Sequence, residues 1–163
     1  MNILMVYPIY PDSFWSFKHA LKFISKKAAF PPLGALTVAA MLPGEWEKKL
    51  VDMNVDVLVD GDILWADYVF ISAMVVQKVS TKEVIQRCND LGVKVVAGGP
   101  LFTTESDAFS GVAHFVLNEA EVTLPLFLAD LKAGNPGKTY STQIHPAITK
   151  TPVPMWSLIN LQK

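Results

Sequence analysis

The chain has 163 residues, of which 51% are hydrophobic and 18% charged, and its formal net charge is −1. This size and apolar content suit one domain with a single buried core. The near-neutral charge and the absence of a polybasic stretch argue against nucleic-acid binding. No apolar run approaches the ~20 residues that span a bilayer, and the N-terminus lacks the basic region of a signal peptide. We therefore expect a soluble, cytoplasmic protein that binds neither nucleic acid nor membrane.

Short apolar segments alternate with segments of helical periodicity along the chain. Strands are predicted at residues 2–7, 47–53, 67–73, 93–97 and 115–117, and helices at 33–42, 80–91 and 121–132. The segment 14–27 is compatible with a helix or with a partly ordered excursion. Strands separated by helices of this length form parallel sheets with right-handed crossovers. The prediction is a Rossmann-like (flavodoxin-like) three-layer α/β sandwich with a central, mostly parallel, five-stranded sheet.

The composition changes after residue 133. Residues 134–163 are rich in Gly, Pro, Thr and Ser and lack sustained periodicity. Thr151-Pro152-Val153-Pro154 is predicted to be extended, because each proline restricts its own backbone and that of its predecessor. We therefore expect a domain at residues 1–133 and an extended linker at residues 134–163.

The loops that follow the strands are the expected ligand site, because ligands bind beyond the carboxyl ends of parallel strands. The loop after the first strand, residues 8–12, contains no glycine, which disfavours NAD or FAD, and no phosphate-binding Gly-x-x-x-x-Gly-Lys motif occurs. A phospho-receiver domain needs an aspartate at the end of the third strand, where this chain has Ser72. A nucleotide-binding or receiver-like regulator is therefore disfavoured.

Three other strand-end loops combine apolar residues, adjacent glycines and a few polar groups. This composition suits a large, flat, partly apolar ligand better than a nucleotide polyphosphate. Gly98-Gly99 permits close approach of a bulky partner to the backbone, although a tight turn alone also explains it. The candidate binding residues are Ser72, Ala73, Met74, Val75, Val76, Gln77, Gly98, Gly99, Pro100, Asn118 and Glu119.

Two other features are expected to be structural. The single cysteine, Cys88, lies on the apolar side of a predicted helix and is expected to be a small core residue, not a reactive thiol. The basic cluster of Lys18, Lys22, Lys26 and Lys27 is expected to be a solvated helix face, not an anion site.

An ordered set of segments adds a resemblance to a known family. The segments are residues 30–40 (Phe-Pro-Pro-Leu-Gly-Ala-Leu-Thr-Val-Ala-Ala), 51–54 (Val-Asp-Met-Asn), 66–72, 98–100 (Gly-Gly-Pro) and 118–121 (Asn-Glu-Ala-Glu). Together they resemble the N-terminal domain of cobalamin-dependent radical S-adenosylmethionine (SAM) proteins, in the branch that includes hopanoid methylases. The resemblance implies a cobalamin-binding module of a methyltransferase, with no catalytic residue of its own. It also implies a C-terminal barrel in the same polypeptide that holds S-adenosylmethionine and an iron–sulfur cluster.

One departure concerns the cobalt ligand. Well-known cobalamin domains carry Asp-x-His-x-x-Gly after the first strand, where the histidine ligates cobalt, but residues 8–14 of this chain contain no histidine. The neighbourhood of His19 does not match the motif, and His114 and His145 are weaker candidates. We therefore expect no protein metal ligand, a cofactor whose own base is displaced from cobalt, and residues 74–77 facing the lower side of the corrin. The alternative is a cofactor-free module for interaction or substrate positioning.

Overall fold

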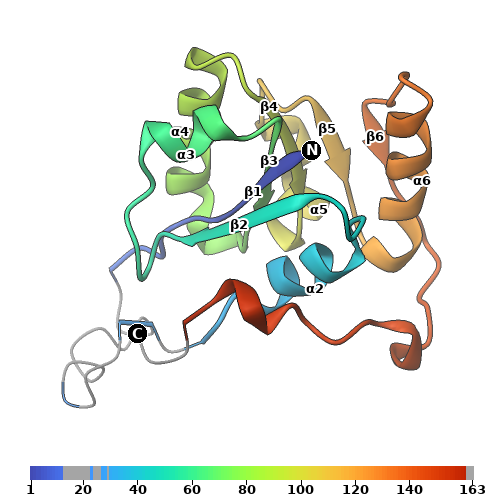
Figure 1. Cartoon of the computed structure of the whole chain (residues 1–163), viewed down its shortest axis with the longest axis horizontal. Helices are drawn as coiled ribbons and strands as arrows, with labels where there is room; N and C mark the ends of the chain where they lie inside the picture. The colour runs from blue at the N-terminus through green and yellow to red at the C-terminus, as the bar shows by residue number, and fades with distance from the viewer. Residues whose placement is uncertain (13–22, 24–26, 29, 161–163) are drawn as a thin grey trace.

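The computed structural model describes residues 1–12, 23, 27–28 and 30–160, and these contain a six-stranded, fully parallel sheet (Figure 1). The strand order is β2-β1-β3-β4-β5-β6. The strands are β1 (Asn2–Tyr7), β2 (Glu47–Asp52), β3 (Tyr68–Ser72), β4 (Lys94–Gly98), β5 (His114–Val116) and β6 (Thr139–Tyr140). The α/β, Rossmann-like fold is confirmed, with one strand more than predicted. β6 has two residues, too few to carry a periodic signal, and it lies in the segment expected to be a linker.

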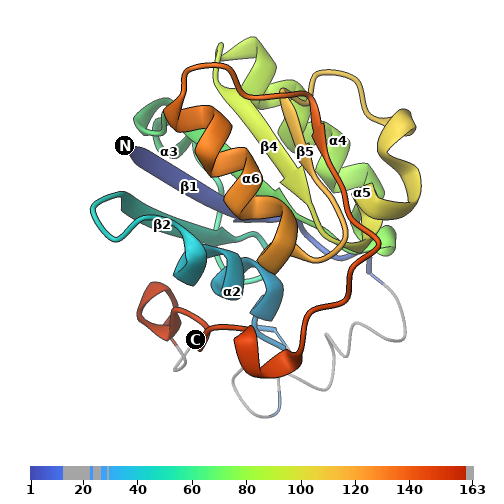
Figure 2. The ribbon, with the colours of Figure 1, turned by 90° about the vertical axis from the view of Figure 1, so that its right-hand side faces the viewer.

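Helices cover both faces of the sheet, as Figure 2 shows. They are α2 (Leu33–Met41), α3 (Asp60–Trp65), α4 (Lys78–Asp90), α5 (Pro100–Glu105) and α6 (Ala120–Lys132). Helices α2 and α6 pack on one face, and α3, α4 and α5 pack on the other. None of the helices in the described residues is long and apolar enough to cross a membrane. The predicted segment 14–27 and most of its lysine cluster fall outside the described residues.

The side chains on the two faces of each central strand belong to two separate hydrophobic clusters. In β3, Val69 and Ile71 join the cluster under α4, and Tyr68 and Phe70 join the cluster under α2 and α6. Side chains of a strand alternate between faces, so a strand buried on both faces is apolar throughout. Cys88 is fully buried in the α4-side cluster, and burial raises the pKa of its thiol to about 11. Its predicted role as a core residue is confirmed.

The predicted start of α4 is wrong, because Ser80 has a different role from the one its spacing indicates. Ser80 and Glu83 have the spacing of a capping box, but α4 begins at Lys78, directly after a single 3-10 turn at Val75–Gln77. The hydroxyl of Ser80 instead accepts a hydrogen bond of 3.1 Å from the amide of Ile9. Ser80 thus ties α4 to the loop after β1, a long-range contact that local spacing does not reveal.

The C-terminal strap, which we define as residues 141–160, runs from β6 past α6 to α2 (Figure 1). The hydroxyl of Thr151 donates a hydrogen bond of 2.6 Å to Oε1 of Glu121 on α6. Farther along, the amide of Met155 donates one of 3.0 Å to the carbonyl oxygen of Leu36 on α2. Met155 and Leu158 pack against the cluster under α2 and α6. The strap therefore crosses the carboxyl end of the sheet next to both helices.

Candidate functional site

A pocket of about 310 Å³ opens at the carboxyl edge of the sheet, between α2 and α6. Its floor is formed by β1, β3, β4 and β5, and its mouth lies beside the C-terminal strap, which contributes Thr151. The volume falls within the usual range of small-molecule sites, about 300–1,000 Å³. The pocket uses the edge at which ligands of parallel sheets bind.

The character of the lining changes with depth. At the mouth lie the polar residues Ser72, Asn118, Glu119, Glu121 and Thr151, and the two glycines that end β4. Farther down the strands and helices the lining is apolar, and it consists of Met5, Val38, Phe70, Val96, Val116 and Leu124. Such a pocket can bury a flat apolar ring at its bottom while hydrogen-bonding a polar chain at its mouth.

The predicted site residues separate into two groups. Six line the pocket: Ser72, Gly98, Gly99, Pro100, Asn118 and Glu119. The others lie outside it: Ala73 and Gln77 are buried, and Met74, Val75 and Val76 are exposed. The strand-end rule therefore located the pocket mouth, and residues 73–77 form a neighbouring surface.

The paired glycines are required by the protein's own backbone. A Cβ on Gly98 would lie 2.7 Å from the carbonyl oxygen of Val116, which is closer than any side chain tolerates. Gly99 has φ +91°, and its Cβ would lie 3.1 Å from the carbonyl oxygen of Ala73. Both glycines also line the pocket. The tight turn therefore accounts for both glycines by itself, and their binding role stays a prediction that their place in the lining is compatible with.

An exposed apolar ridge follows β3. Met74, Val75 and Val76 are 44%, 46% and 59% exposed, an unusual degree for three consecutive apolar residues. The ridge sits at the point where the strand order reverses, between the loops after β1 and β3. Adjacent exposed apolar side chains make this ridge a candidate binding surface.

Gln77 anchors this ridge from below. Its side chain is 1% exposed; its Nε2 donates to the carbonyl oxygen of Pro8, and its Oε1 accepts a hydrogen bond of 2.7 Å from the amide of Met74. Since both ends of the amide are bonded within the protein, the Gln77 side chain is a link between two loops and does not point into the pocket.

A second polar network holds the loop after β1. Oδ1 of Asp52 accepts hydrogen bonds from the amide and the Nδ2 of Asn54, at 2.9 and 2.8 Å. Asn54 in turn accepts a bond from the amide of Tyr10 and donates to the carbonyl oxygen of Pro8. Burial raises the pKa of Asp52, against the lowering effect of the Asn54 bonds. Burial, reinforced by the hydrogen bond to the Tyr10 hydroxyl, also raises the pKa of Tyr7.

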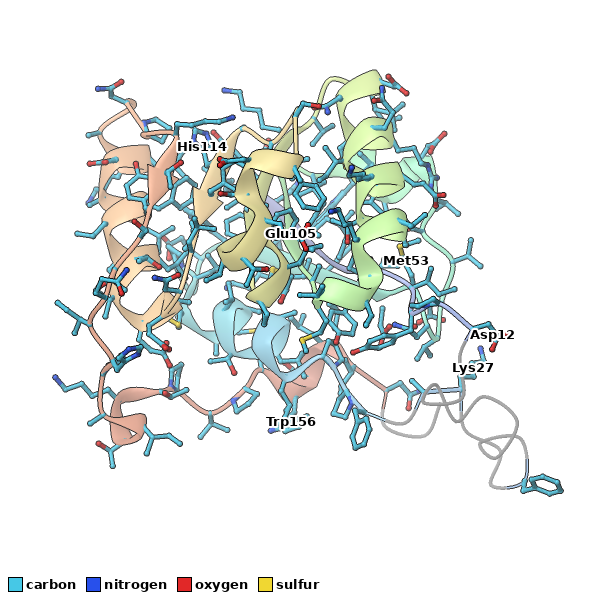
Figure 3. The ribbon with its side chains drawn as sticks, turned by 180° about the vertical axis from the view of Figure 1, so that it is seen from behind. Asp12, Lys27, Met53, Glu105, His114 and Trp156 are labelled. Carbon is cyan, nitrogen blue, oxygen red and sulfur yellow. The ribbon has the colours of Figure 1, made fainter. Side chains whose placement is uncertain are left out.

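The two described histidines do not enter the pocket. His114 is buried near the amino end of β5, away from Trp156 and the strap, as Figure 3 shows, and its Nδ1 lies 2.7 Å from the carbonyl oxygen of Gly137. His145 is on the strap; its side chain is 82% exposed and pairs with Glu119 at 3.2 Å. His19 lies outside the described residues. No group of three or more potential metal-ligating side chains gathers in the described part of the chain.

Sequence patterns did not reveal the side walls of the pocket. Gly34, Thr37 and Val38 come from α2, and Thr151 comes from the strap. The strand-end rule considers only loops, whereas helix walls depend on how α2 lies on the sheet. The bottom of the pocket could have been predicted from strand alternation, because alternate strand residues share a face. Phe70, Val96 and Val116 each lie two positions before a predicted mouth residue.

Three comparisons with known proteins bear on this pocket. Residues 24–128 match the family model of the B12 binding domain. The chain is 39% identical to an uncharacterized methyltransferase of Synechocystis and 30% identical to a hopanoid C-2 methylase of Rhodopseudomonas palustris, over 99% of its length in both cases. It spans 30% and 32% of those two relatives, about a third of their length. No solved structure gives a significant match. The chain belongs to the family of B12-binding domains.

Proposed function

We propose that this chain is the cobalamin-holding module of a methyltransferase, and that it binds the cofactor without a histidine beneath the cobalt. The observation that carries the proposal is the pocket at the carboxyl edge, with a polar mouth and an apolar bottom. Cobalamin has a corrin ring and a tail that ends in an aromatic base. A pocket graded from polar to apolar suits that tail, with the base at the bottom and the linking phosphate and ribose at the mouth.

The corrin itself has a natural seat on the ridge of Met74, Val75 and Val76. The exposed apolar side chains of this ridge offer a flat macrocycle an area to bury. The ridge adjoins the pocket, because Ser72 lines the mouth and Ala73 follows it in the chain. With the base in the pocket and the ring on the ridge, the base cannot also reach the cobalt.

No histidine is available beneath a ring seated in this way among the described residues. His114 is buried near the amino end of β5, and the exposed His145 lies on the strap. The loop after β1 presents Ile9 and Tyr10 to solvent, at 47% and 36% exposure. When bound, cobalamin supplies cobalt chemistry for methyl transfer. The chain contributes binding, orientation and an apolar lower surface.

The partner domain is part of the same proposal. Both relatives are about three times as long as the matched region, and both are named as methyl-transferring proteins. We assign the remaining step to a radical SAM barrel in the same polypeptide, which would hold S-adenosylmethionine and an iron–sulfur cluster. Residues 1–133 would then form the body of the cobalamin domain, and residues 134–163, of which β6 and the strap pack on that body, would lead toward the barrel.

The test is a titration of the 163-residue chain with hydroxocobalamin, followed by visible absorption. Saturable binding with the spectrum of cobalamin whose base has left the cobalt is the expected result. Electron paramagnetic resonance of the reduced, cob(II)alamin complex should lack the splitting from a coordinating nitrogen. Splitting from a histidine nitrogen would refute the histidine-free arrangement, and no binding at all would favour the cofactor-free alternative.

A matched pair of glycine variants ties the binding to this pocket. A Cβ on Gly34 would point toward the hydroxyl of Ser72, at 3.6 Å, so Gly34→Leu fills the mouth from the α2 side. Gly61 on α3 has no neighbour within 4 Å of its Cβ position. We expect Gly34→Leu to abolish cobalamin binding with the circular dichroism spectrum retained, and Gly61→Leu to bind as the unmodified chain does.

A further inference from the structure

The apolar bottom of the pocket bears on which form of the cofactor the domain would bind. We infer that this domain selects the aromatic base at the end of the cofactor tail, and that it favours dimethylbenzimidazole over adenine. The inference rests on the proposed function, since it assumes that the tail enters this pocket. It concerns a separate quantity, the ratio of affinities for two cofactors that differ only in the base.

The strand geometry fixes the depth of the apolar region. Phe70 and Val96 lie two residues before Ser72 and Gly98 on β3 and β4. At about 3.3 Å per residue, they lie about 6.6 Å below the mouth. On the helix side, Leu124 lies one turn below Glu121 and Val38 one turn below Gly34. The deep region is therefore walled by hydrocarbon on β3, β4 and α6, and by Val38 beside Thr37 on α2.

The polar side chains of the lining have little to offer a group at that depth. Thr37 is the polar residue of α2 in the lining, and its hydroxyl donates to the carbonyl oxygen of Leu33 at 2.9 Å. The side chain of Asn118 donates to the strap at the carbonyl oxygen of Thr142, and Glu121 accepts from Thr151. The hydroxyl of Ser72 makes no hydrogen bond among the described residues, and it stands at the mouth. Apart from the Thr37 hydroxyl, whose hydrogen is already donated to Leu33, polar recognition is thus available near the ribose end of the base.

The two bases meet this gradient differently. Dimethylbenzimidazole ends in two methyl groups, which gain by leaving water for a hydrocarbon wall. Adenine ends in an amino group and ring nitrogens, which lose their hydrogen bonds to water and find no partner between Phe70, Val96 and Leu124. Pockets discriminate strongly when the disfavoured ligand buries an unpaired polar group. A ring nitrogen at the shallow end of the base would be common to both bases and would not distinguish them.

The experiment measures dissociation constants of the 163-residue chain for three probes: hydroxocobalamin, the corresponding cobamide with an adenine base, and cobinamide, which lacks the base. We expect cobalamin to bind at least about tenfold more tightly than the adenine cobamide. Equal affinities for these two would overturn the inference and leave the proposed function intact. Failure to bind cobalamin would overturn both.

Two adjacent valines on β4 test whether the apolar bottom of the pocket causes the preference for one base. Val96 lines the pocket, whereas Val95 is equally buried on the opposite face of the sheet. Val96→Thr places a hydroxyl at the pocket bottom and should reduce the affinity ratio by about threefold or more. Val95→Thr adds the same hydroxyl elsewhere and should leave the ratio unchanged. An equal ratio in both variants would overturn the inference.

A milder variant guards against loss of folding in the β4 pair. Val38 is half-buried on α2 and faces the same deep region, so Val38→Thr should fold. It should shift the ratio toward the adenine cobamide, in the same direction as Val96→Thr. If the affinity ratio shifted in the opposite direction or did not change, the inference that the apolar bottom selects the base would be contradicted.

Discussion

Gln77 joins the two loops on either side of the point where the strand order reverses. Its Nε2 donates to the carbonyl oxygen of Pro8 in the loop after β1, and its Oε1 accepts from the amide of Met74 after β3, at 2.7 Å. A primary amide can do both at once because it carries a donor and an acceptor side by side. The buried Gln77 side chain therefore links the ridge, which is the proposed corrin seat, to the loop after β1, as the bond between Ser80 and Ile9 also does.

The first prediction concerns this link. Gln77→Leu keeps the volume but leaves the amide of Met74 without its acceptor and removes one of the two donors to the carbonyl oxygen of Pro8, so we expect a loss of about 1–3 kcal/mol in the free energy of unfolding. Urea denaturation measures it. Gln86 on α4 is exposed, and among the described residues its side chain bonds to Asp90 at 2.7 Å, so Gln86→Leu should change the free energy by less than about 0.5 kcal/mol. Equal effects of the two substitutions would show that the link contributes nothing specific.

The same residue shows how far the sequence could predict the site. Local patterns found the five longer strands and the mouth of the pocket, because period-two apolar runs and strand-end loops are properties of neighbouring residues. The role of Gln77 depends on a residue 69 positions away, as does that of Ser80 on Ile9 71 positions away. Contacts of that kind are set by how the elements pack, so residue type and spacing do not reveal them.

The strap shows a second feature that sequence patterns could not predict. The prolines at 152 and 154 predict an extended backbone, and the strap has an extended Thr151 between 3-10 turns at Ile148–Lys150 and Trp156–Leu158. Such a segment has no periodicity that identifies the surface it covers. The contact of Met155 with α2 depends on one backbone hydrogen bond and on the hydrophobic cluster beneath it. Both become visible only when α2 and α6 are in place on the sheet.

The second prediction concerns pH. Burial raises the pKa of Asp52, so the folded protein binds this proton more tightly than the unfolded chain does. Between the ordinary Asp pKa, about 4, and the raised value, the folded state holds more protons. The free energy of unfolding therefore falls as pH rises through that window. Asp52→Asn keeps the oxygen that accepts from Asn54 and should remove this part of the pH dependence.

Chemical denaturation at a series of pH values from about 4 to 7 tests the assignment. The difference between the unmodified chain and Asp52→Asn should grow with pH in favour of the variant. Asp107→Asn is the control, because Asp107 is exposed and should leave the pH profile unchanged. A difference that shrinks as pH rises would mean that the Asp52 pKa is lowered in the folded state.

The third prediction uses the backbone at the pocket mouth. Gly99 has φ +91°, and an added Cβ would lie 3.1–3.3 Å from the backbone of Ala73 and the hydroxyl of Ser72. Gly99→Ala should therefore destabilise the fold by about 1–3 kcal/mol. Gly61→Ala in α3 meets nothing within 4 Å and should stabilise it by up to about 1 kcal/mol. Opposite signs in thermal unfolding are the expected result, and a neutral Gly99→Ala would show that the backbone there relaxes easily.

The fourth prediction concerns the strap at the mouth. Thr151→Val removes the hydrogen bond of 2.6 Å to Glu121 and keeps the shape of the side chain. A bond of this kind contributes about 1 kcal/mol, which is about a fivefold change in the equilibrium between a docked and an undocked strap. Hydrogen exchange of the Met155 amide, which bonds to Leu36 at 3.0 Å, reports that equilibrium directly. Thr149→Val, at an exposed position two residues away, is the control and should leave the exchange rate unchanged.

If the strap also covers the tail of a bound cofactor, the same pair of variants separates two contributions. A looser strap in Thr151→Val should speed the release of cobalamin by about the factor seen in exchange, because release then passes through the undocked strap. Faster exchange with an unchanged release rate would place the cofactor's exit elsewhere along the mouth, on the side of α2 and Gly34. The ratio of the two rates therefore tells whether the strap or the α2 wall controls access to the pocket.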